Sequence, residues 1–275
     1  MSTTLDRLVD LGAVKRRQQA TWASGDYSAV ATLIVPVAER LVDLADLSAG
    51  SRVLDVATGS GNAAIAAARL GSDVVGIDYV DSLLERGRQR AAAERLHVDL
   101  RSGDAEDLPF PDASFDAVLS VFGSMFAPDH GKTAREIARV TRPGGTIALA
   151  SWTPDGFIGE LFRVVGRYVA PPVGVASPAL WGSADYLESL FGAGVRWTHT
   201  TETFTFRFRS ARAFADYFSV NYGPTLKTLE AAGDRGPEFR AELTGLARSS
   251  NRLDEDGPVA IPATYLASIG VRDAV

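Results

Sequence analysis

The sequence predicts an α/β fold with a doubly wound, mainly parallel sheet that ends in a C-terminal antiparallel hairpin and carries a small helical cap insertion. In the first half of the chain, short apolar and β-branched runs alternate with helical stretches. This alternation is typical of a parallel sheet with helices on both faces. Later, residues 198–209 alternate strictly between apolar and polar side chains, as a half-buried strand does.

The five strands expected in the first half are short apolar runs, covering residues 51–56, 73–78, 98–101, 115–120 and 146–150. Helix-forming residues fill the intervals at 63–70, 82–94 and 133–140, and the last interval closes on the turn sequence Arg142-Pro143-Gly144-Gly145. Because ligands of such sheets bind beyond the carboxyl ends of the strands, functional residues are expected at these strand ends.

The second half of the chain changes character after Ser151. Helices are expected near 156–169 and 185–191, the alternating strand at 198–209, helices at 211–232 and 237–248, and a last strand at 259–269. This order predicts a helical insertion inside the terminal hairpin. The chain then divides into an N-terminal helical lid at 1–44, a core at 45–209, a helical cap insertion at 210–256 and the last strand of the core at 257–275.

The composition and charge of the chain argue against several classes of protein. The 275 residues carry a formal net charge of −6, which argues against a dedicated nucleic-acid binder, because phosphate contacts need concentrated Lys and Arg. The absence of cysteine excludes thiolate metal sites and cysteine nucleophiles, and no metal is expected. No apolar run reaches the roughly 20 residues that span a bilayer, and residues 1–10 lack a signal-peptide pattern. We therefore expect a cytoplasmic protein without a membrane partner.

The loop after the first strand indicates a nucleoside cofactor. Gly59-Ser60-Gly61-Asn62-Ala63-Ala64 matches the dinucleotide pattern G-x-G-x-x-A, which suits NAD as well as S-adenosylmethionine (SAM). Asp55 distinguishes between these two cofactors, because two negative charges about 4 Å apart repel by about 4 kcal/mol at an effective dielectric constant of about 20. A carboxylate here disfavours a pyrophosphate and favours the sulfonium and ammonium of SAM. Alternatively, Asp55 only caps the loop backbone.

Two further strand ends carry carboxylates. Asp78 ends the second strand, where a carboxylate can accept both ribose hydroxyls of either cofactor, and Tyr79 offers an apolar face for an adenine. Asp104 can accept from the adenine amino group, while the backbone N–H of Ala105 can donate to a ring nitrogen. The next two acids, Glu106-Asp107, are expected to be solvated surface.

Together these segments resemble the class I SAM-dependent methyltransferases, over about residues 45–155, and are similar to the methyltransferase-11 or menaquinone-methyltransferase-like branch. The resemblance implies a Rossmann-like sheet, SAM as cofactor and S-adenosylhomocysteine (SAH) as product. The matching segments are Val53-Leu54-Asp55-Val56-Ala57-Thr58-Gly59-Ser60-Gly61, Gly76-Ile77-Asp78, Gly103-Asp104-Ala105-Glu106-Asp107-Leu108-Pro109-Phe110, Phe115-Asp116-Ala117-Val118 and Arg142-Pro143-Gly144-Gly145.

The resemblance also implies where each part of the cofactor lies. Asp78 takes the ribose with Tyr79 beside the adenine, and Asp104 and Ala105 hold the adenine edge. An N-terminal segment often closes over SAM in such proteins, and its candidates here are Trp22 and Tyr27, which alternatively pack on the core. The methionine and sulfonium end is expected beside Asp55, Ala57, Gly59 and Gly61, and the methyl group beside Ser120, Val121 and Phe122.

The methyl acceptor leaves a weaker signal. Methyl transfer mainly needs alignment of the reactants, and a general base only if the acceptor is protonated. His130, after the loop that follows the fourth strand, is the candidate base, or else simply a polar residue that starts the next helix. His97 and His199 are expected to be structural. Residues expected to form an acceptor pocket, or alternatively the cap's own core, are Met125, Phe126, Trp152, Phe157, Trp181, Tyr217, Asn221 and Tyr222.

Three functions are compatible with these features. The first is a methyltransferase that acts on a small molecule, such as an aromatic or secondary metabolite, at oxygen, nitrogen or carbon. The second is a SAM-binding protein of the same fold without methyl transfer, cyclase-like or regulatory. The third, a nicotinamide-dependent oxidoreductase, is disfavoured by Asp55 and by the segment around Asp104. The protein is expected to be a monomer or homodimer.

Overall fold

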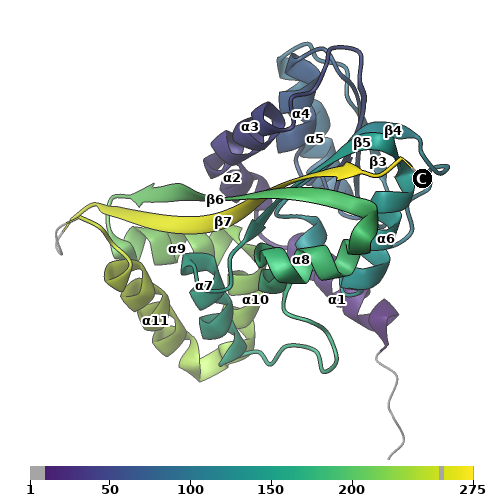
Figure 1. The fold of residues 1–275 in the computed structure, drawn as a ribbon. Helices are drawn as coiled ribbons and strands as arrows, with labels where there is room; N and C mark the ends of the chain where they lie inside the picture. The colour runs from purple at the N-terminus through teal and green to yellow at the C-terminus, as the bar shows by residue number, and fades with distance from the viewer. Residues whose placement is uncertain (1–9, 254–256, 275) are drawn as a thin grey trace, which may run out of the picture.

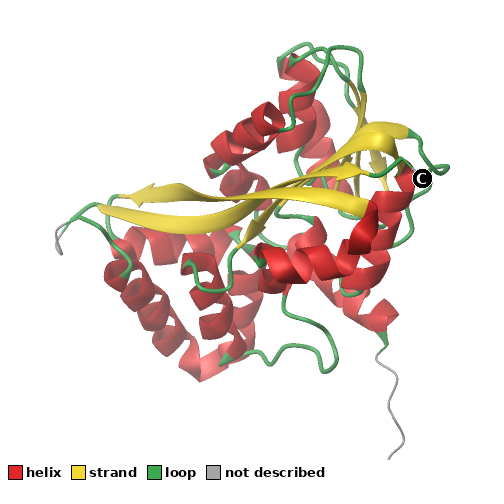
Figure 2. Ribbon diagram, viewed as in Figure 1, coloured by secondary structure: helices red, strands yellow, loops and turns green. Residues whose placement is uncertain are grey.

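A seven-stranded sheet forms the centre of the computed structural model, which describes residues 10–253 and 257–274. The strand order is β3-β2-β1-β4-β5-β7-β6, with helices on both faces (Figures 1 and 2). The first five strands run parallel, whereas β7 pairs antiparallel with both β5 and β6. The predicted doubly wound, Rossmann-like α/β fold with a terminal antiparallel hairpin is confirmed.

The parallel strands lie close to their predicted positions, with one difference. They are β1 (Arg52–Val56), β2 (Asp73–Asp78), β3 (Asp99–Ser102), β4 (Phe115–Val121) and β5 (Thr141–Trp152). β5 begins five residues before the prediction, because Arg142-Pro143-Gly144-Gly145 forms an irregularity within the strand. Phe115 pairs with Thr141 and Ala117 with Thr146, and the extra residues turn at Gly144, whose φ is +74°.

The helices between these strands are α4 (Asn62–Arg69), α5 (Asp81–Ala93) and α6 (His130–Val140). α6 starts three residues before its predicted start. The carboxylate of Asp129 accepts from the backbone N–H of Lys132 at 2.8 Å, which satisfies one of the free donors of the first turn. This cap moves the start of the helix to His130.

The C-terminal hairpin is longer than predicted. β6 (Val195–Phe208) and β7 (Val259–Arg272) pair along their whole length, and the end of the hairpin that β5 does not reach extends over the cap helices (Figure 1). The predicted helix at 211–232 is two helices, because Gly223-Pro224 restarts it with a residue that has no N–H. The remaining helices are α7 (Phe157–Gly166), α8 (Ala184–Phe191), α9 (Ala211–Asn221), α10 (Gly223–Ala232) and α11 (Gly236–Ser249), with 3₁₀ turns at Ser124–Phe126, Pro178–Gly182, Gly192–Gly194 and Gly233–Arg235.

The N-terminal segment contains α1 (Leu11–Trp22), α2 (Tyr27–Leu33) and α3 (Val35–Leu44). α3 buries an apolar face in the core, whereas α1 has no fully buried residue and is attached through polar side chains and through Trp22 at its end. Residues 1–9 of the predicted lid, 254–256 of the predicted cap and residue 275 lie outside the described residues. Within the described residues, no helix is long and apolar enough to cross a membrane.

Backbone contacts join the N-terminal segment to the cap helices. Gly25, with φ +69°, lies so close to the Val220 carbonyl that a Cβ would sit 2.8 Å from its oxygen. A Cβ on Gly223 would sit 2.1 Å from the Thr21 carbonyl oxygen. The turn after α1 therefore rests directly on the junction of α9 and α10.

Gly223→Ala is expected to destabilise the protein by about 1–3 kcal/mol, because the added methyl group forces two backbones apart. The matched control is Gly245→Ala in α11, where nothing lies within 4 Å of the added Cβ. That control is expected to gain roughly 0.5–1 kcal/mol of helix stability. Urea unfolding measures both free energies of unfolding, and equal effects of the two substitutions would contradict the described contact.

Candidate functional site

A hollow lies beyond the carboxyl ends of β1, β2 and β4, where the strand order reverses. Counted together with the space that opens to solvent, it takes in about 920 Å³. Its wall combines the loop after β1, the ends of β2 and β4, the loop after β3, and side chains of α1 and α2. The position is the one that doubly wound sheets use for ligands.

The loop after β1 is built on Asp55. This carboxylate is 2% exposed and accepts from the Thr58 hydroxyl at 2.6 Å and from the Ala64 N–H at 3.0 Å. Burial raises the pKa of Asp55 to about 7, although these two hydrogen bonds oppose the shift. Asp55 therefore supports the loop backbone, as the alternative interpretation held, and also lines the hollow.

Asp78, at the end of β2, holds the same loop from the other side. Its carboxylate accepts from the backbone N–H of Gly59 at 2.9 Å and of Val80 at 2.8 Å. Burial raises the pKa of Asp78 to about 6, against the effect of these hydrogen bonds. Tyr79 lines the hollow beside it, and Gly59 turns there with a φ of +55°. One buried and one half-buried carboxylate thus flank the glycine loop.

The loop after β3 carries an ion-pair cluster. The Lys15 Nζ of α1 lies 2.5 Å from Asp104 and 2.6 Å from Glu106. Glu106 is 2% exposed and also accepts from the Asp129 N–H at 2.8 Å, so the prediction that it is solvated surface is wrong. Its charge is buried because Lys15 pairs with it. Asp107 is exposed, as predicted.

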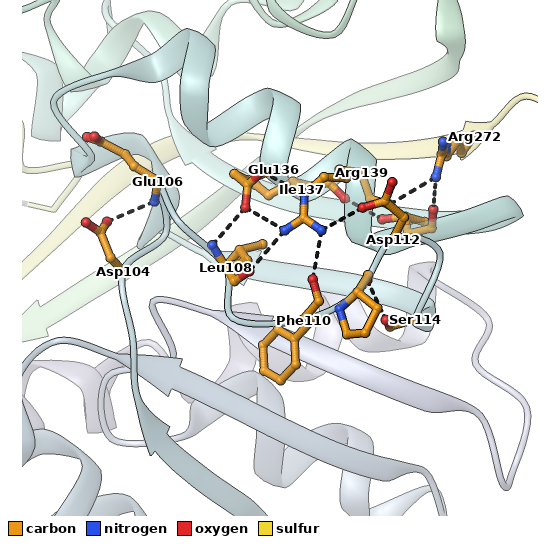
Figure 3. Close-up of polar contacts among 12 residues, drawn as sticks. Asp104, Glu106, Leu108, Phe110, Asp112, Ser114, Glu136, Ile137, Arg139 and Arg272 are labelled. Atoms are coloured by element: carbon orange, nitrogen blue, oxygen red, sulfur yellow. Dashed lines mark hydrogen bonds and ion pairs between the residues drawn. The ribbon is translucent and has the colours of Figure 1, made fainter.

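The rest of that loop is anchored by α6 (Figure 3). Glu136 accepts from the Leu108 N–H at 2.8 Å, and Arg139 donates to the carbonyl oxygens of Leu108 at 3.0 Å and Phe110 at 2.7 Å. Glu136 and Arg139 also pair with each other at 2.7 Å. This fixes the backbone of the Asp-Leu-Pro-Phe segment, and the only signal in the sequence was the (i, i+3) spacing of opposite charges.

The end of β4 forms the apolar wall of the hollow. Phe122 lines it with a φ of +55° and stacks on Trp152, the ring centroids being 3.7 Å apart. A left-handed backbone at a bulky residue is uncommon, and such residues cluster at functional sites. Ala57, at φ +54°, is a second one in the same wall.

Several predicted site residues lie behind this wall. The Ser120 hydroxyl donates to the Val56 carbonyl at 2.8 Å and accepts from the Ser124 N–H at 2.9 Å. Gly61 does not line the hollow, and a Cβ at this position would point toward Ile65 and Gly87 of α5. The predicted cofactor residues that do line the hollow are Trp22, Asp55, Ala57, Gly59, Asp78, Tyr79, Asp104, Ala105 and Phe122, joined by Tyr27 and Val121.

The predicted acceptor residues separate into two groups. Phe126 lines the hollow and packs edge-on against Trp22, with centroids 4.8 Å apart, and Trp22 also contacts Tyr222 at 5.6 Å. The structure does not bring the others to the hollow, because their side chains fill the core or the cap. These are Met125, Trp152, Phe157, Trp181, Tyr217, Asn221 and Tyr222.

His130 also lies away from the hollow. Its Nδ1 shares a hydrogen bond of 2.9 Å with the Tyr186 hydroxyl, and its ring meets Trp181 edge-on. Burial lowers the pKa of His130 to about 4. The residue starts α6, as the alternative interpretation held, and its surroundings are those of a packed histidine. No cluster of metal-ligating side chains occurs in the described part of the chain.

Comparison with known proteins shows that this chain is similar to methyltransferases. The family described as methyltransferase domain matches residues 54–149. An uncharacterised protein of Mycobacterium tuberculosis, Rv1405c, is 42% identical over 237 residues, 83% of this chain and 86% of the relative. Demethylmenaquinone methyltransferase of Deinococcus radiodurans is 39% identical over 140 residues, 50% of this chain and 58% of the relative. The YcgJ protein of Bacillus subtilis has a TM-score of 0.61 at 20% identity, covering 86% of this chain and 98% of that one.

Proposed function

The chain belongs to the class I SAM-dependent methyltransferases, and we propose that it binds SAM in the hollow and methylates a small molecule, with SAH as the second product. The observation that carries this proposal is the pair of carboxylates, buried Asp55 and half-buried Asp78, on either side of the glycine loop. Burial raises the pKa of both groups, and the nearby charge of Asp78 adds to the rise of the pKa of Asp55. A ligand with a sulfonium and an ammonium relieves that cost, whereas a pyrophosphate increases it.

The residues around the hollow fit the parts of SAM in order. In this proposal Asp78 accepts from the ribose hydroxyls, and Asp104 and Ala105 bind the adenine edge; all three line the hollow. Bound SAM supplies a methyl group already activated by its sulfonium. The chain supplies alignment and exclusion of water, through the loop after β1 and the aromatic wall of Trp22, Tyr27 and Phe126.

The chemistry of the wall favours an apolar or aromatic acceptor. The side chains that line the hollow from α2 and the residue after it, and from the segment that follows β4, are apolar or aromatic, including Ile34, Phe122 and Phe126. The cation in the wall, Lys15, is already paired with two carboxylates, so it does not offer a phosphate site. We therefore propose a small-molecule acceptor rather than a nucleic acid or a membrane lipid headgroup.

The test is to incubate the protein with SAM and a panel of small aromatic phenols, amines and polyketide-like enols, and to measure SAH and the methylated product by mass spectrometry. A methylated product in stoichiometric amounts with SAH is expected. Tight binding of SAM and SAH without any methylated product across the panel would favour the alternative of a SAM-binding protein without methyl transfer.

Lys15→Met is expected to weaken SAM binding about fivefold, because it removes roughly 1 kcal/mol of charge-assisted hydrogen bonding that holds α1 over the loop after β3. The control is Arg17→Met on the same helix, whose side chain is exposed. Calorimetric titration with SAM gives both dissociation constants. A weakening of the same size in both variants would show that the cluster of Lys15, Asp104 and Glu106 does not hold the lid.

A further inference from the structure

Arg90 of α5 holds the glycine loop from behind. Its guanidinium Nη1 donates to the Ser60 carbonyl at 2.7 Å and to the Asn62 side-chain oxygen at 2.7 Å, and it reaches the Ser60 hydroxyl at 3.2 Å. Arg90 itself does not line the hollow, but Ser60 and Asn62 do. One side chain therefore fixes the two loop residues that face the ligand space.

The same contact reaches the N-terminal helices. The side-chain amide of Asn62 donates to the Ala31 carbonyl of α2 at 2.8 Å, and Ala31 also lines the hollow. α5 can approach this closely because of Gly87, where a Cβ would lie 3.3 Å from the Ser60 backbone. Arg90, Asn62 and Ala31 thus form one chain of hydrogen bonds from α5 through the loop to α2.

The charge of Arg90 is not balanced locally. The side chain is half-buried, and within residues 10–253 and 257–274 no carboxylate forms an ion pair with it. Glu94, one turn further along α5, is engaged by Arg69 at 2.7 Å. Burial lowers the pKa of Arg90, opposed by the more distant charge of Glu94. A half-buried cation without a counter-ion makes its surroundings favourable for an anion.

The loop thus contacts opposite charges on its two sides, the carboxylate of Asp55 and the guanidinium of Arg90. The first turn of α4, which follows the loop, adds the partial positive charge of a helix N-terminus, and one of its N–H groups, that of Ala64, donates to Asp55. An amino-acid zwitterion, with its ammonium and carboxylate, is the chemical group that matches such a pair. In SAM that group is the methionine end.

We propose that Arg90 is a positioning residue for the methionine end of SAM, which shapes the loop through Ser60 and Asn62 and favours the ligand's carboxylate electrostatically. The inference rests on the proposed function, because it assigns a part of the same site. It predicts that Arg90 matters for ligands that carry the amino-acid group and not for those that carry the adenosine alone.

The test compares SAH with 5′-methylthioadenosine, which keeps the adenosine and thioether but has no amino-acid group, by calorimetric titration of the full chain. Arg90→Gln is expected to raise the dissociation constant for SAH about tenfold, as loss of a charged hydrogen-bond donor does, and to leave that for methylthioadenosine within about twofold. Arg90→Lys, which keeps the charge, is expected to fall between the wild type and Arg90→Gln. Arg86→Gln, on the exposed side of the same helix, is the control and is expected to change neither.

Equal weakening of both ligands by Arg90→Gln would overturn the proposal, since a general loss of loop structure does not distinguish them. No change for either ligand would overturn it as well. If Arg90→Gln does not fold, Arg90→Lys carries the same comparison, and an unchanged ratio of the two constants counts against the proposal. If the wild-type protein binds neither SAM nor SAH, the proposed function itself is wrong. That result is distinguishable, because the wild type is titrated before any variant is made.

Discussion

Asp78→Ala is expected to weaken SAM binding at least about a hundredfold. Two ribose hydroxyls donating to one carboxylate contribute roughly 1.5 kcal/mol each, or about 3 kcal/mol together, and each ~1.4 kcal/mol is a factor of about ten in affinity. The substitution also removes the acceptor of the Gly59 N–H, which lies 2.9 Å from the carboxylate. The glycine loop therefore loses a support as well as a ligand contact.

The matched control for this experiment is Asp73→Ala. Asp73 is the first residue of the same strand, at the end of β2 away from the hollow, and its side chain is exposed. Calorimetric titration with SAM, after circular dichroism has shown both variants to be folded, measures the difference. If the Asp78→Ala protein is folded and binds SAM as tightly as the Asp73→Ala protein does, then the ribose of SAM does not bind to Asp78.

SAM binding is also expected to strengthen with pH, by at least about tenfold between pH 5 and pH 7. The pKa of Asp78 is raised to about 6 and that of Asp55 to about 7 by burial, and the cationic ligand selects the ionised form of both. Each proton that must leave before binding gives about a tenfold change in affinity per pH unit below the pKa. The range stops at pH 7 because the ligand's own α-ammonium titrates near 7.7–8.0 or so.

The same two carboxylates make an opposite prediction for the ligand-free protein. Because their folded-state pKa values lie above the ordinary value of 3.8, the stability that they contribute is complete below about pH 4 and is lost as the pH rises through about 6 to 7. The thermal shift caused by SAM should therefore grow over this interval. Thermal melts at pH 5, 6 and 7 with and without SAM measure it, and a shift that is constant or shrinks with pH would show that these acids do not face a cation.

Much of the fold was predictable because its signals are local. Four of the parallel strands, β1, β2, β4 and β5, contain a short apolar run, and such a run can be recognised without knowing which distant residues it contacts. The differences arise where tertiary contacts override a local signal. The sequence around Gly144 has the composition of a turn, yet the neighbouring strand β4 keeps it inside β5, and the Asp129 cap extends α6 at its start.

The candidate site was predictable only in part, for a related reason. Asp55, Asp78 and Asp104 stand at strand ends, and the rule that places ligands there needs no knowledge of side-chain contacts. Lys15 and Arg90 were missed because their partners are 89 and 30 residues away in the chain. A single sequence does not indicate which lysine or arginine reaches which loop.

The aromatic residues show the other limit of a single sequence. Phe126 and Trp181 were both predicted to line the acceptor pocket, but Phe126 lines the hollow and Trp181 is completely buried against His130. Large apolar side chains belong to cores far more often than to ligand sites. Which face of a helix or loop such a residue occupies is decided by packing between segments that are distant in the chain.

The most direct test of the account is a calorimetric titration of the purified protein with SAM, SAH and NADH in parallel. The two carboxylates on either side of the glycine loop, Asp55 and Asp78, predict that SAM and SAH bind and that NADH does not. Binding of NADH without binding of SAM or SAH would contradict the account, and the loop after β1 would then be a dinucleotide site.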